Sequence, residues 1–288
     1  MIAQKLANLQ PELDNFIKNA LHEDVRDGDH SSLACILPDA RSKARLFIKD
    51  NGILAGMDLA EYIFAHIAPA TVFTRFLNDG DAIKKGDIAF EVEGEIQNIL
   101  MLERLVLNCM QRMSGIATQT HEMASKIADL PTKLLDTRKT TPGIRFLEKW
   151  AVRIGGGVNH RFGLFDMIML KDNHVDGAGG IEKAIEATKK YLSEKSLDLK
   201  IEVETRNLEE VEQVLQAGGV DRIMLDNFDI PTLKQAVELI GENYETEASG
   251  GITIDTLRDY ALTGVDFISS SAMTHSVRSL DLSLKLVK

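Results

Sequence analysis

The sequence has few cysteines and no clustered histidines. Cys35 and Cys109 are the only cysteines among 288 residues, and they are too few and too far apart for a disulfide framework. Neither has a second cysteine or a histidine at zinc-ligand spacing, and the seven scattered histidines form no HExxH pattern. These absences exclude a disulfide-stapled scaffold and the commonest zinc sites.

Targeting and membrane segments are also missing. The first residues, MIAQKLANLQPELDNF, contain no basic segment followed by an apolar run, so we expect no secretory signal peptide. No apolar stretch reaches the length needed to cross a membrane. A reducing, cytoplasmic location is therefore expected.

Excess positive charge is the third absence. The formal net charge is -11, which argues against general nucleic-acid binding because phosphate backbones attract basic surfaces. Apolar and charged residues occur at ordinary globular levels, so the chain has ample core for one large α/β domain or two smaller ones. A small anionic ligand in a local basic pocket is compatible with this charge.

The first part of the chain mixes helical and strand patterns. We expect an amphipathic helix over residues 1–20, a polar loop over 21–32, and strands in ARLFIKDNGILAG and TVFTRFLNDGDAIKKGDIAFEVEGEI. The segment 97–130 predicts one or two long helices, broken near Ser114 and Gly115.

From about residue 133, short apolar runs alternate with helical stretches. Runs such as KLLDT, DMIMLK, KIEVET and DRIMLD are each followed by a helical pattern, which is typical of βα units around a parallel sheet. Pro142 suits the first position of a helix, with Thr140 or Thr141 as its N-cap. The pattern predicts an α/β barrel or an open relative of one.

Polar residues collect where these strands end. Barrel enzymes place their active sites at the carboxyl ends of their strands. Here those positions supply cations, carboxylates and two small-residue loops: Arg138, Lys139, Lys171, Glu204, Asp226, Ser249, Gly250, Gly251, Ser269, Ser270 and Ser271. This inventory predicts a ligand site.

The segment 133–171 is basic within an acidic chain. It holds eight lysines or arginines against three acids, which predicts an anion pocket. Guanidinium forks bind planar carboxylates, and lysine supplies a mobile point charge. We assign function to the cations at turns and strand ends, with two histidines as further donors, and a solvated helix face to the others. The first group is Arg138, Lys139, Arg161 and Lys171 with His160 and His174; the second is Lys149, Arg153 and Arg145.

The loops EASGGIT and SSSAMTHS each lie between a strand and a helix. Backbone N–H groups at such a position can bind phosphate, and small residues let it approach. Two such loops at neighbouring strands late in a barrel match the usual phosphate position of these folds.

Glu202 and Glu204 alternate along KIEVET, so they share one face of the strand. Inward carboxylates need a cation, a metal or ligand hydroxyls. With Asp226 on the next strand they could hold Mg²⁺ or sugar hydroxyls, and the alternative is an ion pair with Lys171 or Arg206. We favour function for Glu204 and Asp226, and both interpretations stay open for Glu202.

The block DTRKTTPGIRFLEKWAVRIGGGVNHRFGLFDMIMLKDNH resembles the signature of the quinolinate phosphoribosyltransferases, also called carboxylating nicotinate-nucleotide pyrophosphorylases. ERLVLNCMQRMSGIATQT, DRIMLDN, EASGGI and TGVDFISSSAMTHS occur in the family's order, and the likeness runs from about residue 20 to the C-terminus. It implies an α/β fold with an N-terminal α/β sandwich domain, residues 1–115, and a TIM-like barrel, open or incomplete, over residues 116–288. The last residues, about 275–288, would pack back on the first domain.

The resemblance also implies an activity. The family transfers phosphoribosyl from phosphoribosyl pyrophosphate (PRPP) to quinolinate, giving nicotinate mononucleotide, pyrophosphate and carbon dioxide in de novo NAD biosynthesis. Quinolinate contacts would come from Thr137, Arg138, His160, Arg161 and Lys171, with Arg104 reaching the site from the partner in a homodimer or higher oligomer. PRPP contacts would come from Lys139, Glu204, Asp226, Ser249, Gly250, Gly251, Ser269, Ser270, Ser271 and His275.

Further expectations follow for catalysis and cofactors. Lys139, Lys171, Glu204 and Asp226 are the implied catalytic residues, with Mg²⁺ at Glu204 and Asp226, directly or through water. We expect no redox cofactor, because the GGGVNH glycines follow a helix rather than a strand and so fail the dinucleotide pattern. Ser271 stands where the family usually has glycine; serine resists positive φ, so the geometry of this loop is an open question.

Three alternatives compete with this interpretation. One is a paralogue of the same fold associated with molybdenum transport, and another is a nicotinate-using phosphoribosyltransferase. Arg104, Arg138 and Arg161 together favour a dicarboxylate over nicotinate. The third is a non-catalytic phosphosugar-binding protein, against which Glu204 and Asp226 argue.

Overall fold

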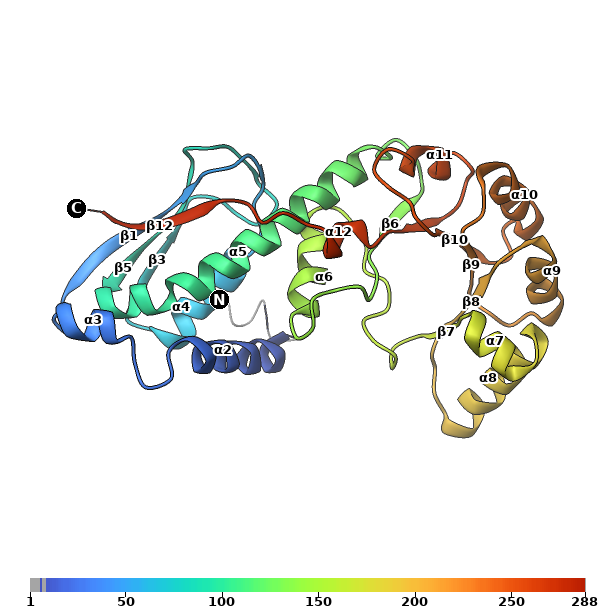
Figure 1. Ribbon diagram of the computed structural model, residues 1–288, viewed down its shortest axis with the longest axis horizontal. Helices are drawn as coiled ribbons and strands as arrows, with labels where there is room; N and C mark the ends of the chain where they lie inside the picture. Colours follow the sequence, from blue (N-terminus) through green and yellow to red (C-terminus); the bar gives the residue numbers. More distant parts are fainter. Residues whose placement is uncertain (1–5, 7–8, 288) are drawn as a thin grey trace. The chain divides into compact units, whose positions relative to one another are not determined.

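The computed structural model describes residue 6 and residues 9–287. They form two compact units, the first made of Met1–His121, Thr141–Gly156 and Ser276–Lys288, and the second of Glu122–Thr140 and Gly157–His275. Figure 1 labels the elements of both. The boundary expected at residues 115 and 116 lies inside one helix and remains a prediction, as does the division into domains itself.

The first unit is built on an antiparallel sheet of four strands. Its order is β12 (Leu282–Val287), β1 (Arg41–Ile48), β5 (Ile88–Glu95) and β3 (Val72–Arg75). The inward faces pack on helices through aromatic pairs, such as Phe64 with Phe90. The other elements are α2 (Gln10–Asp24), α3 (His30–Cys35), β2 (Gly52–Ile53), α4 (Met57–Ile67), β4 (Ala82–Ile83), α5 (Ile96–Ser125) and α6 (Arg145–Ile154).

The N-terminal helix begins later than expected. Helix α2 starts at Gln10, next to Pro11, and runs four residues beyond the predicted end at residue 20. Residues 1–5 and 7–8 of the predicted helix lie outside the described residues. The predicted polar loop is shorter, because Asp29 caps a helix by accepting hydrogen bonds from the N–H groups of Ser31 and Ser32.

Helix α5 is continuous through Ser114 and Gly115, so the predicted break is wrong. Gly115 serves packing: a Cβ there would come 2.3 Å from the carbonyl oxygen of Arg278. Ser114 also faces the protein, where its Oγ accepts a hydrogen bond of 2.9 Å from the N–H of Ala55. Both small residues let other segments approach the helix closely.

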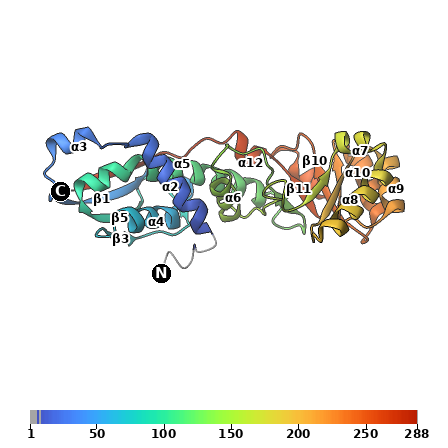
Figure 2. The same ribbon diagram turned by 90° about the horizontal axis from the view of Figure 1, so that it is seen from below.

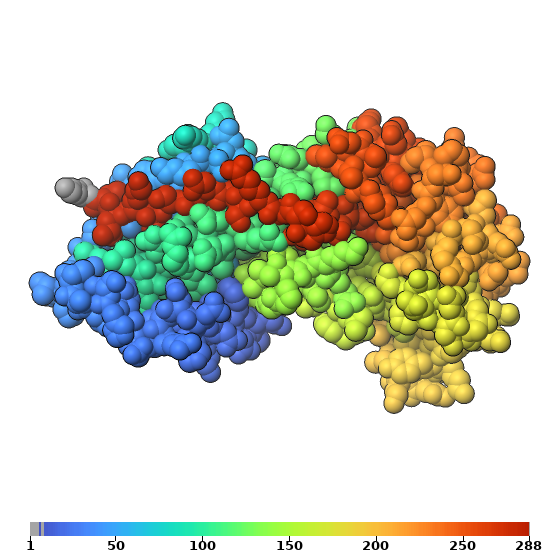
Figure 3. All heavy atoms as spheres, viewed as in Figure 1, coloured from blue at the N-terminus to red at the C-terminus, as the bar shows by residue number. Residues whose placement is uncertain are grey.

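The C-terminal segment packs along α5 within the first unit. Gln111 Nε2 donates to the carbonyl oxygen of Leu282 at 3.0 Å, and Arg112 Nη1 donates to that of Val277 at 3.2 Å. Figure 3 shows this segment in red beside the green of α5. The last strand, β12, then pairs with β1 from Lys43 opposite Val287 to Ile48 opposite Leu282.

Helix α6 differs from its prediction in two ways. It begins at Arg145 with no side-chain cap, so Pro142, Thr140 and Thr141 do not start or cap it. Lys149 is only 2 % exposed, so it does not belong to a solvated face. The helix is buried within the first unit because Phe146 packs edge-on against Phe16.

The second unit contains a parallel sheet of six strands. Its order is β6 (Lys133–Leu135), β11 (Phe267–Ser269), β10 (Glu245–Ser249), β9 (Arg222–Asp226), β8 (Ile201–Thr205) and β7 (Ile168–Leu170). Among the described strands β6 and β7 are the edges, so the barrel is open. Val158 adds an isolated parallel bridge to Leu135 at the β6 edge.

Helices follow these strands, as the βα pattern predicted. They are α7 (Asp172–Ala178), α8 (Ile181–Lys195), α9 (Leu208–Ala217), α10 (Ile230–Ile240), α11 (Leu257–Ala261) and α12 (Ala272–His275). Figures 1 and 2 both show α8, α9 and α10 on one side of the strands. Within the described ranges, no helix combines the length and apolar character needed to cross a bilayer.

Candidate active site

The predicted site residues of the second unit meet at one edge of the parallel sheet. Because all six strands run the same way, their carboxyl ends share that edge. The register places Asp226 beside Ser249 and Ser269 beside Leu135. Lys171 follows β7 directly, and Arg138 is the third residue after the end of β6.

A cation and a carboxylate pair at the ends of β7 and β8. Lys171 Nζ forms an ion pair with Glu204 Oε2. The lysine side chain is half-exposed, whereas that of Glu204 is nearly buried. On the next strand Asp226 is partly exposed, and its Oδ2 accepts a hydrogen bond of 2.6 Å from Asn227 Nδ2. The edge therefore carries a lysine and two carboxylates that line a continuous stretch of three strands.

Arg138 and Arg161 lie close enough to repel each other. Burial lowers the pKa of the Arg161 guanidinium, and the charge of Arg138 lowers it further. Arg161 is held by a hydrogen bond of 3.2 Å from its Nη1 to the carbonyl oxygen of Met167. Two like charges held together indicate a place that an anion would stabilise.

The loop after β6 is tied to the C-terminal part of the unit. The N–H of Lys139 donates to Thr137 Oγ1 at 3.0 Å, and its carbonyl oxygen accepts from Thr274 Oγ1 at 2.9 Å. The side chain of Lys139 is exposed. The backbone that carries Arg138 and Lys139 is thus fixed, while the lysine amine is free to reach a ligand.

His160 lies inside the unit rather than at its surface. Its Nε2 is 3.0 Å from Glu202 Oε2 and 3.3 Å from Glu247 Oε2, and its Nδ1 accepts a hydrogen bond of 2.6 Å from the N–H of Arg161. Its own N–H donates to Asp136 Oδ1 at 2.8 Å. Both ring nitrogens therefore have partners within the protein.

Glu202 and Glu247 are fully buried, and both lie near His160 and Arg222. Arg222 Nη1 lies 3.0 Å from Glu247 Oε2, and its guanidinium stacks over Phe267 at 4.0 Å. Burial and the neighbouring Glu247 raise the pKa of Glu202 to about 7. Burial alone would lower the pKa of His160, but the two carboxylates outweigh it and raise that pKa to about 9.

One hydrogen bond of His160 opposes the rise in its pKa. The carboxylates favour an imidazolium, whereas the N–H of Arg161 requires an unprotonated Nδ1. A neutral imidazole beside a protonated Glu202 carries the same number of protons as an imidazolium beside two carboxylates. With Arg222 included, both arrangements have zero net charge, as a buried cluster requires. Because Nδ1 accepts a hydrogen bond, the geometry favours the neutral imidazole beside a protonated Glu202.

Glu247, Asp136 and Arg222 were not predicted as site residues from the sequence. Glu245 and Glu247 alternate on YETEAS just as Glu202 and Glu204 do on KIEVET, so the same argument about inward carboxylates would have found Glu247. The alternative of an ion pair with Lys171 or Arg206 is wrong for Glu202, whereas its Lys171 part is confirmed for Glu204. Lys171 pairs with Glu204, and Arg206 pairs with Glu210 and Asp176.

The two small-residue loops have different geometries. Gly250 and Gly251 have φ of +104° and +61°, and a Cβ on Gly250 would come 2.2 Å from Asn227 Oδ1, so this loop requires glycine. Ser271 does not adopt a positive φ. Its carbonyl oxygen accepts from the N–H of Thr274 at 3.0 Å, opening α12 without strain.

Three other candidates lie outside this edge or serve local structure. Arg104 is on α5 in the first unit, exposed, with Nη2 3.3 Å from Glu103 Oε1. His174 Nδ1 accepts from the N–H of Lys171 at 3.0 Å and so caps α7. His275 ends α12 with an exposed side chain.

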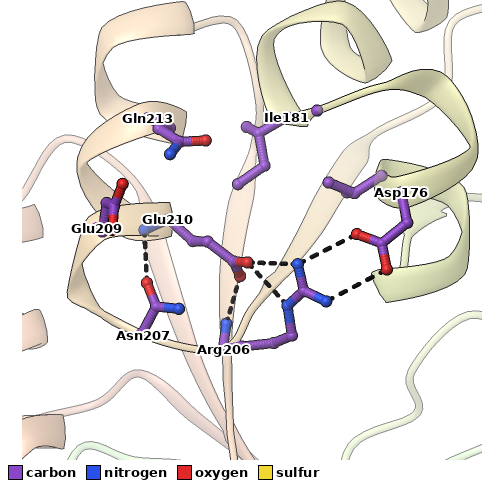
Figure 4. A pocket seen from close by; sticks show the side chains of 9 residues that line it. Asp176, Ile181, Arg206, Asn207, Glu209, Glu210 and Gln213 are labelled. Carbon is purple, nitrogen blue, oxygen red and sulfur yellow. Dashed lines mark hydrogen bonds and ion pairs between the residues drawn. The ribbon is translucent and has the colours of Figure 1, made fainter.

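A polar pocket of about 260 Å³ lies between α7, α8 and α9. Arg206 is at its centre, with Nη2 2.6 Å from Glu210 Oε1 and 3.2 Å from Asp176 Oδ1 (Figure 4). Because Arg206, the one cation among the described lining residues, is already paired with two carboxylates, the pocket offers an anionic ligand little to bind. We place the candidate site at the strand edge instead.

The fold and the residues at the carboxyl ends of the strands define the class of protein. An open α/β barrel that presents cations, carboxylates and two small-residue loops at its carboxyl edge is typical of barrel enzymes that handle phosphorylated ligands. A family model described as quinolinate phosphoribosyl transferase, C-terminal domain, matches residues 116–285, and its N-terminal counterpart matches residues 29–114. The chain belongs to the quinolinate phosphoribosyltransferase family, which confirms the resemblance seen in the sequence.

Individual relatives agree over nearly the whole chain. Quinolinate phosphoribosyltransferase [decarboxylating] 2b, mitochondrial, of Nicotiana tabacum is 48% identical over 290 residues, covering 96% of this chain and 82% of the relative. A probable nicotinate-nucleotide pyrophosphorylase [carboxylating] of Synechocystis is 42% identical and covers 96% and 93%. The crystal structure of NadC from Streptococcus pyogenes superposes with a TM-score of 0.89 at 38% identity, covering 96% of this chain and 97% of that one. The expected fold class is thereby confirmed.

Proposed function

We propose that this protein transfers the phosphoribosyl group of PRPP to quinolinate and releases pyrophosphate and carbon dioxide, giving nicotinate mononucleotide for de novo NAD synthesis. The observation that carries the proposal is the meeting of Arg138 and Arg161 at the strand edge that also holds Lys171. Quinolinate has two adjacent carboxylates, and a pair of guanidiniums beside a lysine suits them.

Quinolinate binding is assigned to the cations that follow β6 and β7, the two end strands of the open barrel. Arg138, Arg161 and Lys171 hold the two carboxylates, and Thr137 and His160 line the same stretch. A partner subunit contributes Arg104, which is exposed on α5. The protein therefore works as a homodimer or a larger assembly.

PRPP binding is assigned mainly to residues at the carboxyl ends of the middle strands, β8 to β11. Residues 249–251 and 269–271 bind the 5′-phosphate through backbone N–H groups, since Gly250 and Gly251 leave no side chain in the way, and His275 lies next to the second loop. Glu204 and Asp226 bind the ribose hydroxyls, and Lys139 and Lys171 face pyrophosphate.

The carboxylates of this edge fit Mg²⁺, which prefers oxygen ligands and usually binds through one or two carboxylates and substrate phosphates. Glu204 and Asp226 are the residues that would hold it, and Lys171 would then exchange Glu204 for pyrophosphate. When bound, Mg²⁺ supplies positive charge to the leaving group. No redox cofactor takes part in the proposed reaction.

The reaction needs alignment and charge stabilisation rather than a protein nucleophile. As the bond from ribose C1 to pyrophosphate breaks, its electron pair leaves with pyrophosphate, and C1 gains oxocarbenium character. The lone pair of the pyridine nitrogen forms the new bond and makes the ring cationic. The carbon–carbon bond to the adjacent carboxylate then breaks, the ring receives the electrons, carbon dioxide leaves and the carbon takes up a proton.

The comparisons bear on the alternatives. The relatives named above are quinolinate or carboxylating enzymes by name, whereas human nicotinic acid phosphoribosyltransferase is 14% identical with a TM-score of 0.58, a likeness of fold alone. We propose a cytoplasmic location. Several plant relatives carry mitochondrial or chloroplastic in their names, so fractionation of the source cells decides this point.

One assay tests the activity directly. Purified protein with Mg²⁺ and PRPP receives either carboxyl-labelled quinolinate or nicotinate, and released carbon dioxide and mononucleotide are measured. We expect both products from quinolinate and none from nicotinate. Turnover of nicotinate alone would refute the proposal, and binding of PRPP without turnover of either acid would identify a phosphosugar-binding protein.

A further inference from the structure

The buried side chains behind the candidate site form a four-membered cluster, of which the proposed reaction uses only His160. The cluster consists of His160, Glu202, Arg222 and Glu247. Glu202 and Glu247 are 0% exposed and His160 is 9% exposed, so the cluster lies inside the unit. Burying these charges is costly unless the cluster fixes something that function needs.

The cluster joins the segment beside the end strand β6 to the middle strands of the sheet. Glu202 is on β8, Arg222 on β9 and Glu247 on β10, whereas His160 is in the segment that runs along the β6 edge. His160 therefore connects that segment to three strands that are not its neighbours in the sheet. No other side chain of the short stretch 158–161 is buried.

His160 in turn fixes the two arginines. Its Nδ1 accepts from the N–H of Arg161, and its N–H donates to Asp136, whose other oxygen accepts from Asn159 Nδ2 at 2.6 Å. Asp136 precedes Thr137 and Arg138 at the end of β6. The imidazole thus sets the backbone position of Arg161, and the backbone N–H of His160 ties the same segment through Asp136 to the loop carrying Arg138.

We propose that Glu247, together with Glu202, is a positioning residue that orients His160, and that His160 acts on quinolinate through Arg161 instead of touching it. This inference rests on the proposed function and assigns His160 a different role within it. Both ring nitrogens of His160 have partners in the protein, which leaves none for a substrate carboxylate.

Glu247→Gln and Glu245→Gln form a matched pair for the test. Both residues are on β10 and both lie 3.0 Å from Arg222, but Glu247 faces His160 and Glu245 does not. We expect Glu247→Gln to weaken quinolinate binding and raise its KM about tenfold, because a small displacement of Arg161 misplaces its fork. The KM for PRPP should change less than that for quinolinate, although Glu247 also accepts a hydrogen bond from Ser269 in the phosphate loop. Glu245→Gln should leave both values near those of the wild type.

A double-mutant cycle of His160→Asn and Arg161→Lys supplies the second measurement, so the test survives a variant that fails to fold. The two effects on quinolinate binding, measured by calorimetry without PRPP, should be clearly less than additive if His160 acts through Arg161. Additive effects, or equal quinolinate binding by the two β10 variants, would overturn the inference.

Further outcomes distinguish the positioning role from a cation site and from failure of the proposed function. A rise in Tm on adding Mn²⁺ or Zn²⁺ that Glu247→Gln abolishes would show that His160, Glu202 and Glu247 form a cation site, and the positioning role would then be wrong. A wild-type protein that binds no quinolinate would refute the proposed function itself. Normal wild-type turnover with indistinguishable β10 variants would refute the positioning role alone.

Discussion

At Gly250 the backbone turns through a conformation that side-chain-bearing residues rarely adopt. Its φ is +104°, and an added Cβ would come 2.2 Å from Asn227 Oδ1 and 2.8 Å from Asn227 N. Asn227 is itself in the left-handed region, with φ of +57°, and its N–H donates to the carbonyl oxygen of Ser249. A methyl group at Gly250 must therefore push apart the ends of β9 and β10.

Gly250→Ala should raise the KM for PRPP about tenfold and leave quinolinate affinity unchanged, because the displaced loop belongs to the phosphate side of the edge. Gly264→Ala is the control: φ there is +90°, so it carries similar backbone strain of about 1–2 kcal/mol, but the nearest atom to its Cβ is 3.8 Å away. Steady-state kinetics with each substrate varied in turn gives the KM values of both variants for comparison. Equal PRPP constants for the two variants would show that this loop does not bind phosphate.

Single residues were predictable where the strand period alone decides their direction. Lys171, Glu204, Asp226 and Ser249 were placed at strand ends from the sequence, and they lie there. Partners were less predictable, because side-chain spacing does not say which strands are neighbours across a sheet. For Glu202 an ion pair with Lys171 or Arg206 was one of two open interpretations, yet the residue faces His160, some 40 residues earlier in the chain.

Helix α5 shows how one element combines two demands. Over its 30 residues it must remain straight for hydrogen bonding, and it must also admit the C-terminal segment at Gly115. Glycine in a helix interior costs about 1 kcal/mol relative to alanine, which is why the sequence pattern predicted a break there. The close approach of Arg278 explains why the glycine is present without one.

Gly115→Ala should lower the Tm although alanine favours helix. The added Cβ would meet the Arg278 carbonyl oxygen at 2.3 Å, and overpacking of this kind costs about 1–3 kcal/mol, more than the gain in propensity. Gly177→Ala in α7 is the control, because nothing lies within 4 Å of its Cβ and only the gain of up to about 1 kcal/mol remains.

Thermal unfolding followed by circular dichroism should therefore give Tm changes of opposite sign for these two variants. A rise for both would mean that the C-terminal segment does not pack on α5 as described.

The alternation of strands and helices was predictable as a pattern because each βα unit repeats the same local rule. The six strands of the second unit and the helices after them follow that rule. Helix α6 was not predictable in the same way. Its sequence fits a barrel helix, but tertiary contacts of Phe146 with Phe16 place it in the first unit.

On the scale of the whole molecule, the open question is how many chains build one site. Arg104 is exposed on α5 in the first unit, whereas Arg138 and Arg161 are in the second. We predict that mixing inactive Arg104→Ala and Lys171→Ala chains restores up to about a quarter of wild-type activity. One site of a mixed dimer then contains both intact residues.

The experiment needs proof that subunits exchange. Differently tagged chains, refolded together and purified through both tags, provide mixed dimers in known amount. Activity in these dimers and none in either parent supports a shared site. Inactive mixed dimers would assign Arg104 to a different role.

The pairing of β12 with β1 also determines when the protein can finish folding. Strand β1 consists of residues 41–48, but its neighbour β12 consists of residues 282–287 and is synthesised much later. Until β12 has been translated, the first unit has an unpaired sheet edge at β1, and it also needs the later segment Thr141–Gly156. Emergence of β12, rather than of the segment that carries β1, is therefore the event that closes this unit, and chains truncated before β12 should expose the edge of β1 and be prone to aggregate.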